Sequence, residues 1–147
     1  MMTRIAFLAL LLIPTLTYAS PSRMKIAADN EPGQRIVITG HVFGVDGKPR
    51  SLVMYAYHTD AQGLYNRDAK GVARLHGTLV SGADGFYEID TIKPAPYPNR
   101  NIPAHIHVHL RWDGKDQEEE IRFDGKGASI CHLVENRCTV DFRLRRN

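Results

Sequence analysis

The stretch Tyr97-Pro98-Asn99-Arg100-Asn101-Ile102-Pro103-Ala104-His105-Ile106-His107-Val108-His109-Leu110 decides the fold of this chain. Its second half alternates imidazole and apolar residues with a period of two. Successive side chains of an extended strand point to opposite faces, so His105, His107 and His109 share one face and the apolar residues share the other. The apolar face predicts burial in a core. The imidazole face indicates a metal site, because imidazole is the commonest metal ligand in proteins.

The residues on either side of this stretch have the pattern of short β-strands separated by turns. The strands are rich in β-branched and aromatic residues, turn dipeptides such as Asp-Gly lie between them, and no segment has a helical period of useful length. The predicted strands are residues 36–43, 51–57, 74–80, 86–92, a strand that ends at Trp112, 118–123 and 139–144. This pattern predicts one all-β domain over residues 35–147, folded as an antiparallel β-sandwich.

The N-terminal part of the chain predicts export. Residues 1–19 combine a positive charge at Arg4, an apolar run over 5–16 and a small residue, Ala19, at the expected cleavage position. This is the pattern of a secretory signal peptide, and the run is shorter than the roughly 20 apolar residues that a membrane span needs. We therefore expect a secreted or periplasmic protein with no membrane attachment after cleavage. Residues 20–34 are polar, with prolines and a glycine, and are expected to form a flexible N-terminal arm.

The chain has two cysteines, Cys131 and Cys138, spaced C-x6-C. In an exported protein, an isolated pair of this kind predicts one disulfide that closes a short C-terminal loop. Two free thiols are the alternative.

The charge pattern gives little indication of a nucleic-acid partner. The formal net charge of the full chain is +3 at pH 7, and its basic residues are dispersed except in the tail at 143–146. Nucleic-acid binding proteins usually gather basic residues on one face or stripe. We expect no nucleic-acid partner, and a solvated C-terminal end.

Two tyrosines in loop positions are candidates to complete the metal site. Tyr65 follows Gly63, and Tyr97 lies between two prolines. A phenolate is a hard, anionic donor that suits a trivalent ion, so two imidazoles and two phenolates favour Fe(III), whereas zinc prefers Cys, His and carboxylate. Taken one at a time, these residues also fit packing roles: a loop tyrosine with its hydroxyl satisfied, or a half-buried His-x-His pair.

Three segments resemble the intradiol ring-cleavage dioxygenases, which include the catechol and protocatechuate dioxygenases. Residues 40–49 look like the opening strand and turn of that family's β-sandwich, and 57–65 are similar to its W-[HQ]-A-[ND]-x-x-G-x-Y segment. Residues 83–107 are similar to its run D-G-x-Y-x-[FI]-x-T-[IV]-x-P … Y-P … P-A-H-I-H. The resemblance covers about residues 35 to 125.

The resemblance implies a specific site and reaction. The fold would be a β-sandwich of the intradiol dioxygenase or transthyretin-like type. Tyr65, Tyr97, His105 and His107 match the family's four ligands of a non-haem Fe(III) ion. A catecholic substrate and O2 would react there, with Tyr97 taking up a substrate proton, to give a muconate-type diacid.

The sequence departs from the family pattern at four positions around the site. Ile102 stands where the family usually has an arginine, and Arg100, two residues earlier, is the expected catalytic substitute. Glu120 falls near a family glutamine, and Tyr57 stands in place of a tryptophan. These changes bear on rate and substrate class more than on metal binding.

Two other interpretations remain open from the sequence. The turn motifs also look like those of transthyretin-like and carboxypeptidase-regulatory-like domains, which are non-enzymatic β-sandwich modules without a metal. Alternatively, His105, His107 and His109 form a zinc site. This is the weakest alternative, because residues i and i+4 of a straight strand are about 13 Å apart.

Overall fold

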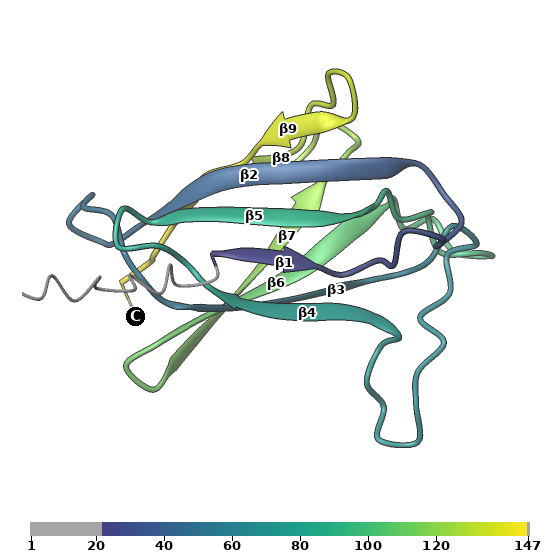
Figure 1. Ribbon diagram of the computed structural model, residues 1–147, viewed down its shortest axis with the longest axis horizontal. Coiled ribbons are helices and arrows are strands. Elements are labelled where there is room, and N and C mark those ends of the chain that lie inside the picture. Colours follow the sequence, from purple (N-terminus) through teal and green to yellow (C-terminus); the bar gives the residue numbers. More distant parts are fainter. Residues whose placement is uncertain (1–21, 147) are drawn as a thin grey trace, which may run out of the picture.

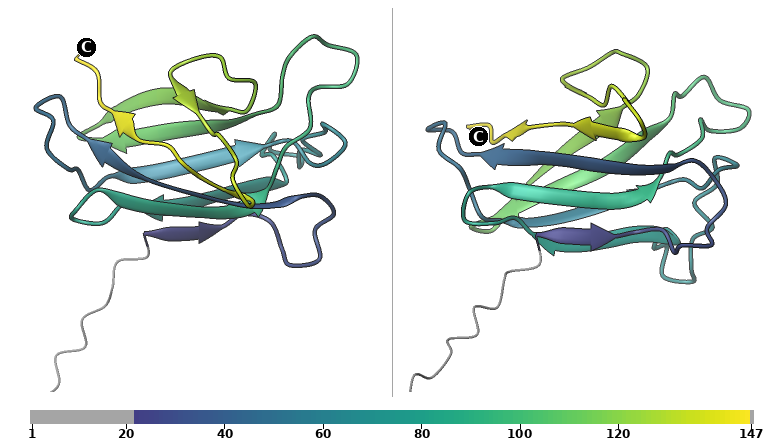
Figure 2. Two further views of the ribbon diagram at one scale, coloured as in Figure 1. Left: turned by 90° about the horizontal axis from the view of Figure 1, so that it is seen from above. Right: turned by 45° about the horizontal axis from the view of Figure 1, so that its top comes forward.

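The computed structural model describes residues 22–146. The predicted signal peptide, residues 1–19, lies outside this range. Two five-stranded sheets pack face to face (Figure 1, Figure 2). Their strands are β1 (Arg23–Lys25), β2 (Arg35–Phe43), β3 (Val53–His58), β4 (Leu75–Val80), β5 (Phe86–Ile92), β6 (His105–Trp112), β7 (Lys115–Arg122), β8 (Ser129–Ile130), β9 (Arg137–Thr139) and β10 (Phe142–Arg143). Nowhere in residues 22–146 does a helix occur that is long and apolar enough to cross a membrane.

The predicted antiparallel β-sandwich is confirmed for the long strands. One sheet has the order β1-β5-β2-β10, with β9 also paired to β2, and the other has the order β4-β3-β6-β7-β8. The pairs β2–β5, β3–β4, β3–β6 and β6–β7 are antiparallel. The short strands β1, β8, β9 and β10 pair in parallel with their neighbours, so both sheets are mixed at their margins.

The core lies between the two sheets and is filled by alternating residues, as the sequence predicts. Every second residue of β2 is buried, and on β6 the side chains of Ile106, Val108 and Leu110 are fully buried. Each such aliphatic side chain contributes roughly 1.5–3 kcal/mol to stability by leaving water. Because β6 is a central strand of its sheet, this burial fixes its register and turns all its histidines to the outer face.

The prediction of a flexible arm at residues 20–34 is wrong for residues 23–27, and its first two residues lie outside the described range. Within it, β1 pairs in parallel with β5, and Met24, Ile26 and Ala27 are buried. Three residues are too few to show a strand period in the sequence. The unpaired edge of β5 supplies backbone partners that local sequence does not reveal.

The C-terminal region also differs from its prediction. The strand expected at 139–144 is two short strands, β9 and β10, separated by Val140 and Asp141. Beside it, β7 begins at Lys115 rather than 118, because Asp113 and Gly114, both with positive φ, make a two-residue hairpin turn. The predicted disulfide between Cys131 and Cys138 is present.

Candidate metal centre

The histidines of β6 meet two tyrosines from separate loops at one end of the outer sheet face. His105 and His107 are successive outward residues of β6, Tyr65 lies in the loop between β3 and β4, and Tyr97 lies in the loop between β5 and β6. Figure 1 shows the β3–β4 loop projecting beyond the sandwich. His105 is buried, and the other three side chains are half-buried.

The four donor atoms form a closed ring. His105 Nε2 lies 3.0 Å from His107 Nε2, His107 Nε2 lies 3.1 Å from the Tyr65 hydroxyl, and the Tyr97 hydroxyl lies 3.4 Å from His105 Nε2. The hydroxyls of Tyr65 and Tyr97 are hydrogen-bonded to each other and close the ring. The structure therefore brings together all four residues that the resemblance implies as ligands.

The other nitrogen of each imidazole fixes its tautomer. Nδ1 of His105 donates to the carbonyl of Pro103 at 2.8 Å, and Nδ1 of His107 donates to the Glu118 carboxylate at 3.2 Å. Nε2 of each ring is then an unprotonated acceptor that points into the ring of donor atoms. Two hydroxyl protons, those of Tyr65 and Tyr97, serve four acceptor atoms. Such a cluster of convergent lone pairs is suited to a cation, and an outer partner on each ligand imidazole is typical of metal sites.

A buried carboxylate shapes the loop that carries Tyr65. Asp60 accepts hydrogen bonds from the backbone N–H of Gln62 at 2.9 Å and of Leu64 at 3.0 Å, and from the amide of Asn66 at 2.6 Å. Gly63 has a φ of +80°, and a Cβ there would lie 2.1 Å from the carbonyl oxygen of Pro96. The glycine thus permits the Tyr65 loop to touch the Tyr97 loop.

Two further contacts tie the loops together. The Thr59 hydroxyl donates to the carbonyl of Ala95 at 2.9 Å, and the Ala95 N–H donates to the carbonyl of Asp60 at 3.1 Å. Tyr97 itself is held by its N–H, which donates to the carbonyl of Ile102 at 3.3 Å. The two tyrosines are therefore placed by one connected loop structure rather than by two independent ones.

The surroundings of Tyr65 and His107 favour the neutral form of each side chain. Burial, reinforced by the hydrogen bond from Tyr97, raises the pKa of Tyr65 well above its usual value. Burial, followed by the neighbouring His105, lowers the pKa of His107. A metal ion that binds all four residues must displace both phenolic protons, so its affinity depends on pH.

The other predicted residues lie outside the ring. Arg100 is exposed in the turn after Tyr97, and its side chain forms no hydrogen bond or ion pair within residues 22–146, so its catalytic role stays a prediction. Ile102 supplies only its backbone carbonyl. His109 points its Nδ1 at Asp116, 2.9 Å away, and does not join the metal-binding group found among the described residues. The zinc site of three histidines is therefore not formed.

Sequence reasoning missed two residues that contact the side chains of the proposed ligands. The Glu118 carboxylate accepts from His107, and the Arg67 guanidinium carbon lies 4.5 Å from the centre of the Tyr65 ring. Their positions follow from cross-strand register and from the fold of the β3–β4 loop. A histidine that binds a metal usually donates its other ring N–H to an acceptor. The His-x-His pattern therefore predicted that His107 would have such a partner, but not that the partner would be Glu118.

The donor set fits a trivalent iron ion. Phenolate and imidazole together match the hardness and charge of Fe(III), and the three edges that include an imidazole nitrogen, 3.0 to 3.4 Å long, suit ligands about 2.0–2.2 Å from one ion. Tyr65, Tyr97, His105 and His107 are the residues that would hold such an ion.

Comparisons with known proteins identify relatives of this chain. A family model described as Dioxygenase matches residues 15–134. Catechol 1,2-dioxygenase 1 of Acinetobacter lwoffii is 31% identical over 113 residues, 63% of this chain and 36% of that protein. The beta chain of protocatechuate 3,4-dioxygenase from Burkholderia cepacia is 35% identical over 99 residues, 58% of this chain and 42% of that one. The chain thus spans less than half the length of these curated relatives.

Solved structures share the fold over most of the chain. The dioxygenase domain of a dioxygenase carbohydrate-binding protein fusion from Streptomyces sp. SirexAA-E superposes with a TM-score of 0.69 and 28% identity, covering 92% of this chain and 95% of that one. An intradiol ring-cleavage dioxygenase from Tetranychus urticae has the same fold, with a TM-score of 0.67 at 18% identity over 84% of this chain and 87% of that one. The family match across most of the sequence, together with the catechol and protocatechuate dioxygenase relatives, establishes that the chain belongs to the intradiol ring-cleavage dioxygenases.

Proposed function

We propose that this protein is a non-haem Fe(III)-dependent intradiol dioxygenase that cleaves catechol-type rings with O2 to muconate-type diacids. The observation that carries the proposal is the closed ring of two phenol oxygens and two imidazole nitrogens. The relatives named above act on catechol and protocatechuate, which supports a small substrate with adjacent ring hydroxyls.

A ferric ion held by these residues would supply Lewis-acid activation and a template for the two substrate oxygens. The protein's own part is to hold the ligands and to move protons. Pro103 and Glu118 keep His105 and His107 in the tautomer that presents Nε2. Tyr97 is the proton acceptor for one substrate hydroxyl that the family resemblance implies, and its phenol oxygen lies at the ring, 3.4 Å from His105 Nε2.

The reaction balances without a further reductant. Both atoms of O2 are added to the two carbon atoms that carry the hydroxyls, and the bond between these carbons breaks. The product is a diacid with the same number of hydrogens as the catechol. Because Ile102 has no charge, a guanidinium group that stabilises negative charge on the reacting substrate has to come from another position. The guanidinium of Arg67 lies over the aromatic ring of Tyr65, and it is the cationic group found in contact with one of the four proposed ligands.

The alternative of a non-enzymatic β-sandwich module is less well supported. Such a module has no use for two tyrosine oxygens and two histidine nitrogens that converge on one point. We also propose that the protein is exported. The Cys131–Cys138 disulfide supports an oxidising compartment, in agreement with the signal pattern at 1–19.

The test is to load purified protein with Fe(III) and record its visible spectrum and its O2 uptake with catechol and protocatechuate. Tyrosinate-to-ferric charge transfer should colour the protein burgundy. Tyr65→Phe and Tyr97→Phe should each shift or abolish the band, while Tyr55→Phe, on the same sheet face but outside the ring, should leave it unchanged. A colourless iron-loaded protein would exclude the ferric tyrosinate centre, and an unchanged band in both ring variants would exclude these ligands.

A further inference from the structure

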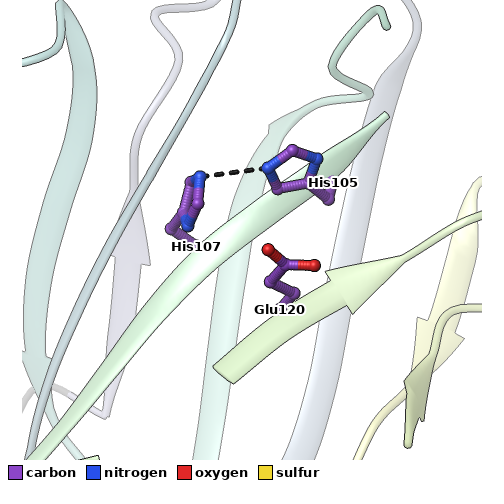
Figure 3. A group of neighbouring side chains, drawn as sticks. All are labelled: His105, His107 and Glu120. Atoms are coloured by element: carbon purple, nitrogen blue, oxygen red, sulfur yellow. Dashed lines mark hydrogen bonds between the residues drawn. The ribbon is translucent and has the colours of Figure 1, made fainter. Parts of the chain in front are cut away.

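A carboxylate of the neighbouring strand β7 also approaches the histidine pair. Glu120 lies on β7 directly across from His107 in the antiparallel register. Its carboxylate oxygen and the nitrogens of His105 and His107 all lie within 4.8 Å of one another (Figure 3). Whereas the two tyrosines reach the pair from loops, Glu120 reaches it from a neighbouring strand of the same sheet.

One oxygen of this carboxylate is held, and the other is left for a ligand. Arg122 Nη1 donates to Glu120 Oε2 at 3.2 Å, and the same guanidinium donates to Asp124 at 3.0 Å. Glu118 and Glu120 have different parts in the site, since Glu118 bonds the outer Nδ1 of His107. Glu120 is therefore the carboxylate that faces the metal-binding side of the two rings (Figure 3).

Only a small movement would bring the three residues onto one ion. Two ligands about 2.1 Å from a metal are at most roughly 4.2 Å apart, so a carboxylate oxygen at the 4.8 Å limit would have to approach by at least about half an ångström. The side chain of Glu120 is 40% exposed, which leaves it room to change rotamer. The two imidazole nitrogens, 3.0 Å apart, need no adjustment.

Two imidazoles and one carboxylate are a donor set for divalent ions. This combination holds zinc in hydrolytic enzymes and Fe(II) in many oxygenases, and it carries one negative charge where the two phenolates carry two. We propose that His105, His107 and Glu120 form a second, divalent-metal donor set that shares its histidines with the ferric set but does not need Tyr65 or Tyr97. The chain then binds a divalent ion through the strand side of the histidine pair and a ferric ion through the loop side.

Binding of Co(II) and Zn(II) to the metal-free protein tests this proposal. Calorimetry gives the affinity for each ion, and the visible spectrum of Co(II) reports its ligands. Glu120→Gln should weaken binding of both ions by at least about tenfold, because loss of even an outer partner of a metal ligand costs 10- to 100-fold. The double variant Tyr65→Phe/Tyr97→Phe should keep the wild-type affinity and Co(II) spectrum. Glu119→Gln, which makes the same charge change on the other face of β7, is the matched control.

The ferric charge-transfer band separates this proposal from the proposed function. Glu120→Gln should retain the band, which also shows that the variant is folded. Unchanged Co(II) and Zn(II) binding in Glu120→Gln would overturn the second donor set, and so would loss of that binding in the double tyrosine variant. A wild-type protein with no ferric band but with Glu120-dependent Co(II) binding would refute the proposed dioxygenase site and leave the divalent site standing.

Discussion

The ring of Tyr57 stacks on the imidazole of His107, with centroids 4.6 Å apart and planes 11° from parallel. The two residues are opposite each other in the β3–β6 register, so the contact follows from the pairing of the strands. On its outer edge, the same imidazole donates to Glu118 on β7. His107 is thus fixed on its face by one neighbouring strand and at Nδ1 by the other.

Glu118→Ala should weaken Fe(III) binding by roughly 10- to 100-fold, because the outer acceptor keeps Nε2 of His107 unprotonated and aimed at the ring. Competition with a chelator, followed by the charge-transfer band, measures the change. Glu118→Gln retains an acceptor oxygen and should recover part of the affinity. Asp116→Ala removes the equivalent partner of His109 and should change little. Equal losses in both alanine variants would contradict the role given to Glu118.

Asp60→Ala should lower the free energy of unfolding by several kcal/mol. The buried carboxylate accepts three hydrogen bonds, and a hydrogen bond to a charged group contributes about 1.5–3 kcal/mol. Asp68 makes the same two backbone contacts, to the N–H of Lys70 and of Val72, in an exposed part of the loop. Asp68→Ala is therefore the control and should cost less. Urea unfolding measures both, and the ferric band should change only in Asp60→Ala, because only Asp60 shapes the Tyr65 turn.

Local pattern predicted the parts of this structure that depend on neighbours in sequence. The alternation of residues in β6 predicted both its buried face and its outward histidines. The resemblance implied that Tyr65 and Tyr97 join these histidines from distant loops. The fold then brought these four residues together. The disulfide followed from the isolation of Cys131 and Cys138 and from the expected compartment.

What sequence could not reveal depends on pairing between distant strands. Parallel strand β1 exists because β5 offers it a free edge, and Met24 gains its burial only there. Glu118 and Glu120 stand in a run of three glutamates, and only the register of β7 against β6 sends Glu118 to Nδ1 of His107 and Glu120 to the pair formed by His105 and His107. Arg67 lies in a loop without periodicity, so its contact with Tyr65 had no signal in the sequence.

Arg67→Gln should shift the ferric charge-transfer band to lower energy. The guanidinium lies 4.5 Å from the centre of the Tyr65 ring and stabilises negative charge on it, so its removal raises the energy of the donor phenolate. The nearby charge also opposes the rise in the pKa of Tyr65, so the pH needed to form the band should increase in the variant. Arg111→Gln makes the same change beside Tyr55 and should leave the band in place. Identical spectra for Arg67→Gln and the wild type would remove Arg67 from the site.

Replacing both Cys131 and Cys138 with serine should lower the free energy of unfolding by about 2.5 kcal/mol, as expected for the closure of a short loop. The two cysteines are 7 residues apart, and both are buried in the core. Chemical denaturation with and without a reductant measures the effect. The reductant should destabilise the wild type and leave the double variant unchanged. The ferric band should survive, since the disulfide does not contact the ring of donor atoms.

His58 should make the protein less stable as the pH falls below 6.5. It is fully buried, its Nδ1 donates to the carbonyl of Thr59 at 2.7 Å, and its Nε2 accepts from the Thr91 hydroxyl at 2.7 Å. Burial lowers the pKa of His58 to about 4, against 6.5 in the unfolded chain. The unfolded state therefore binds the proton first, and stability is full above pH 6.5 and declines toward pH 4 by roughly 3 kcal/mol. His58→Gln, which cannot titrate, should show a flatter pH dependence of the free energy of unfolding from pH 7 to pH 4. Parallel curves for the two proteins would mean that another group causes the acid sensitivity.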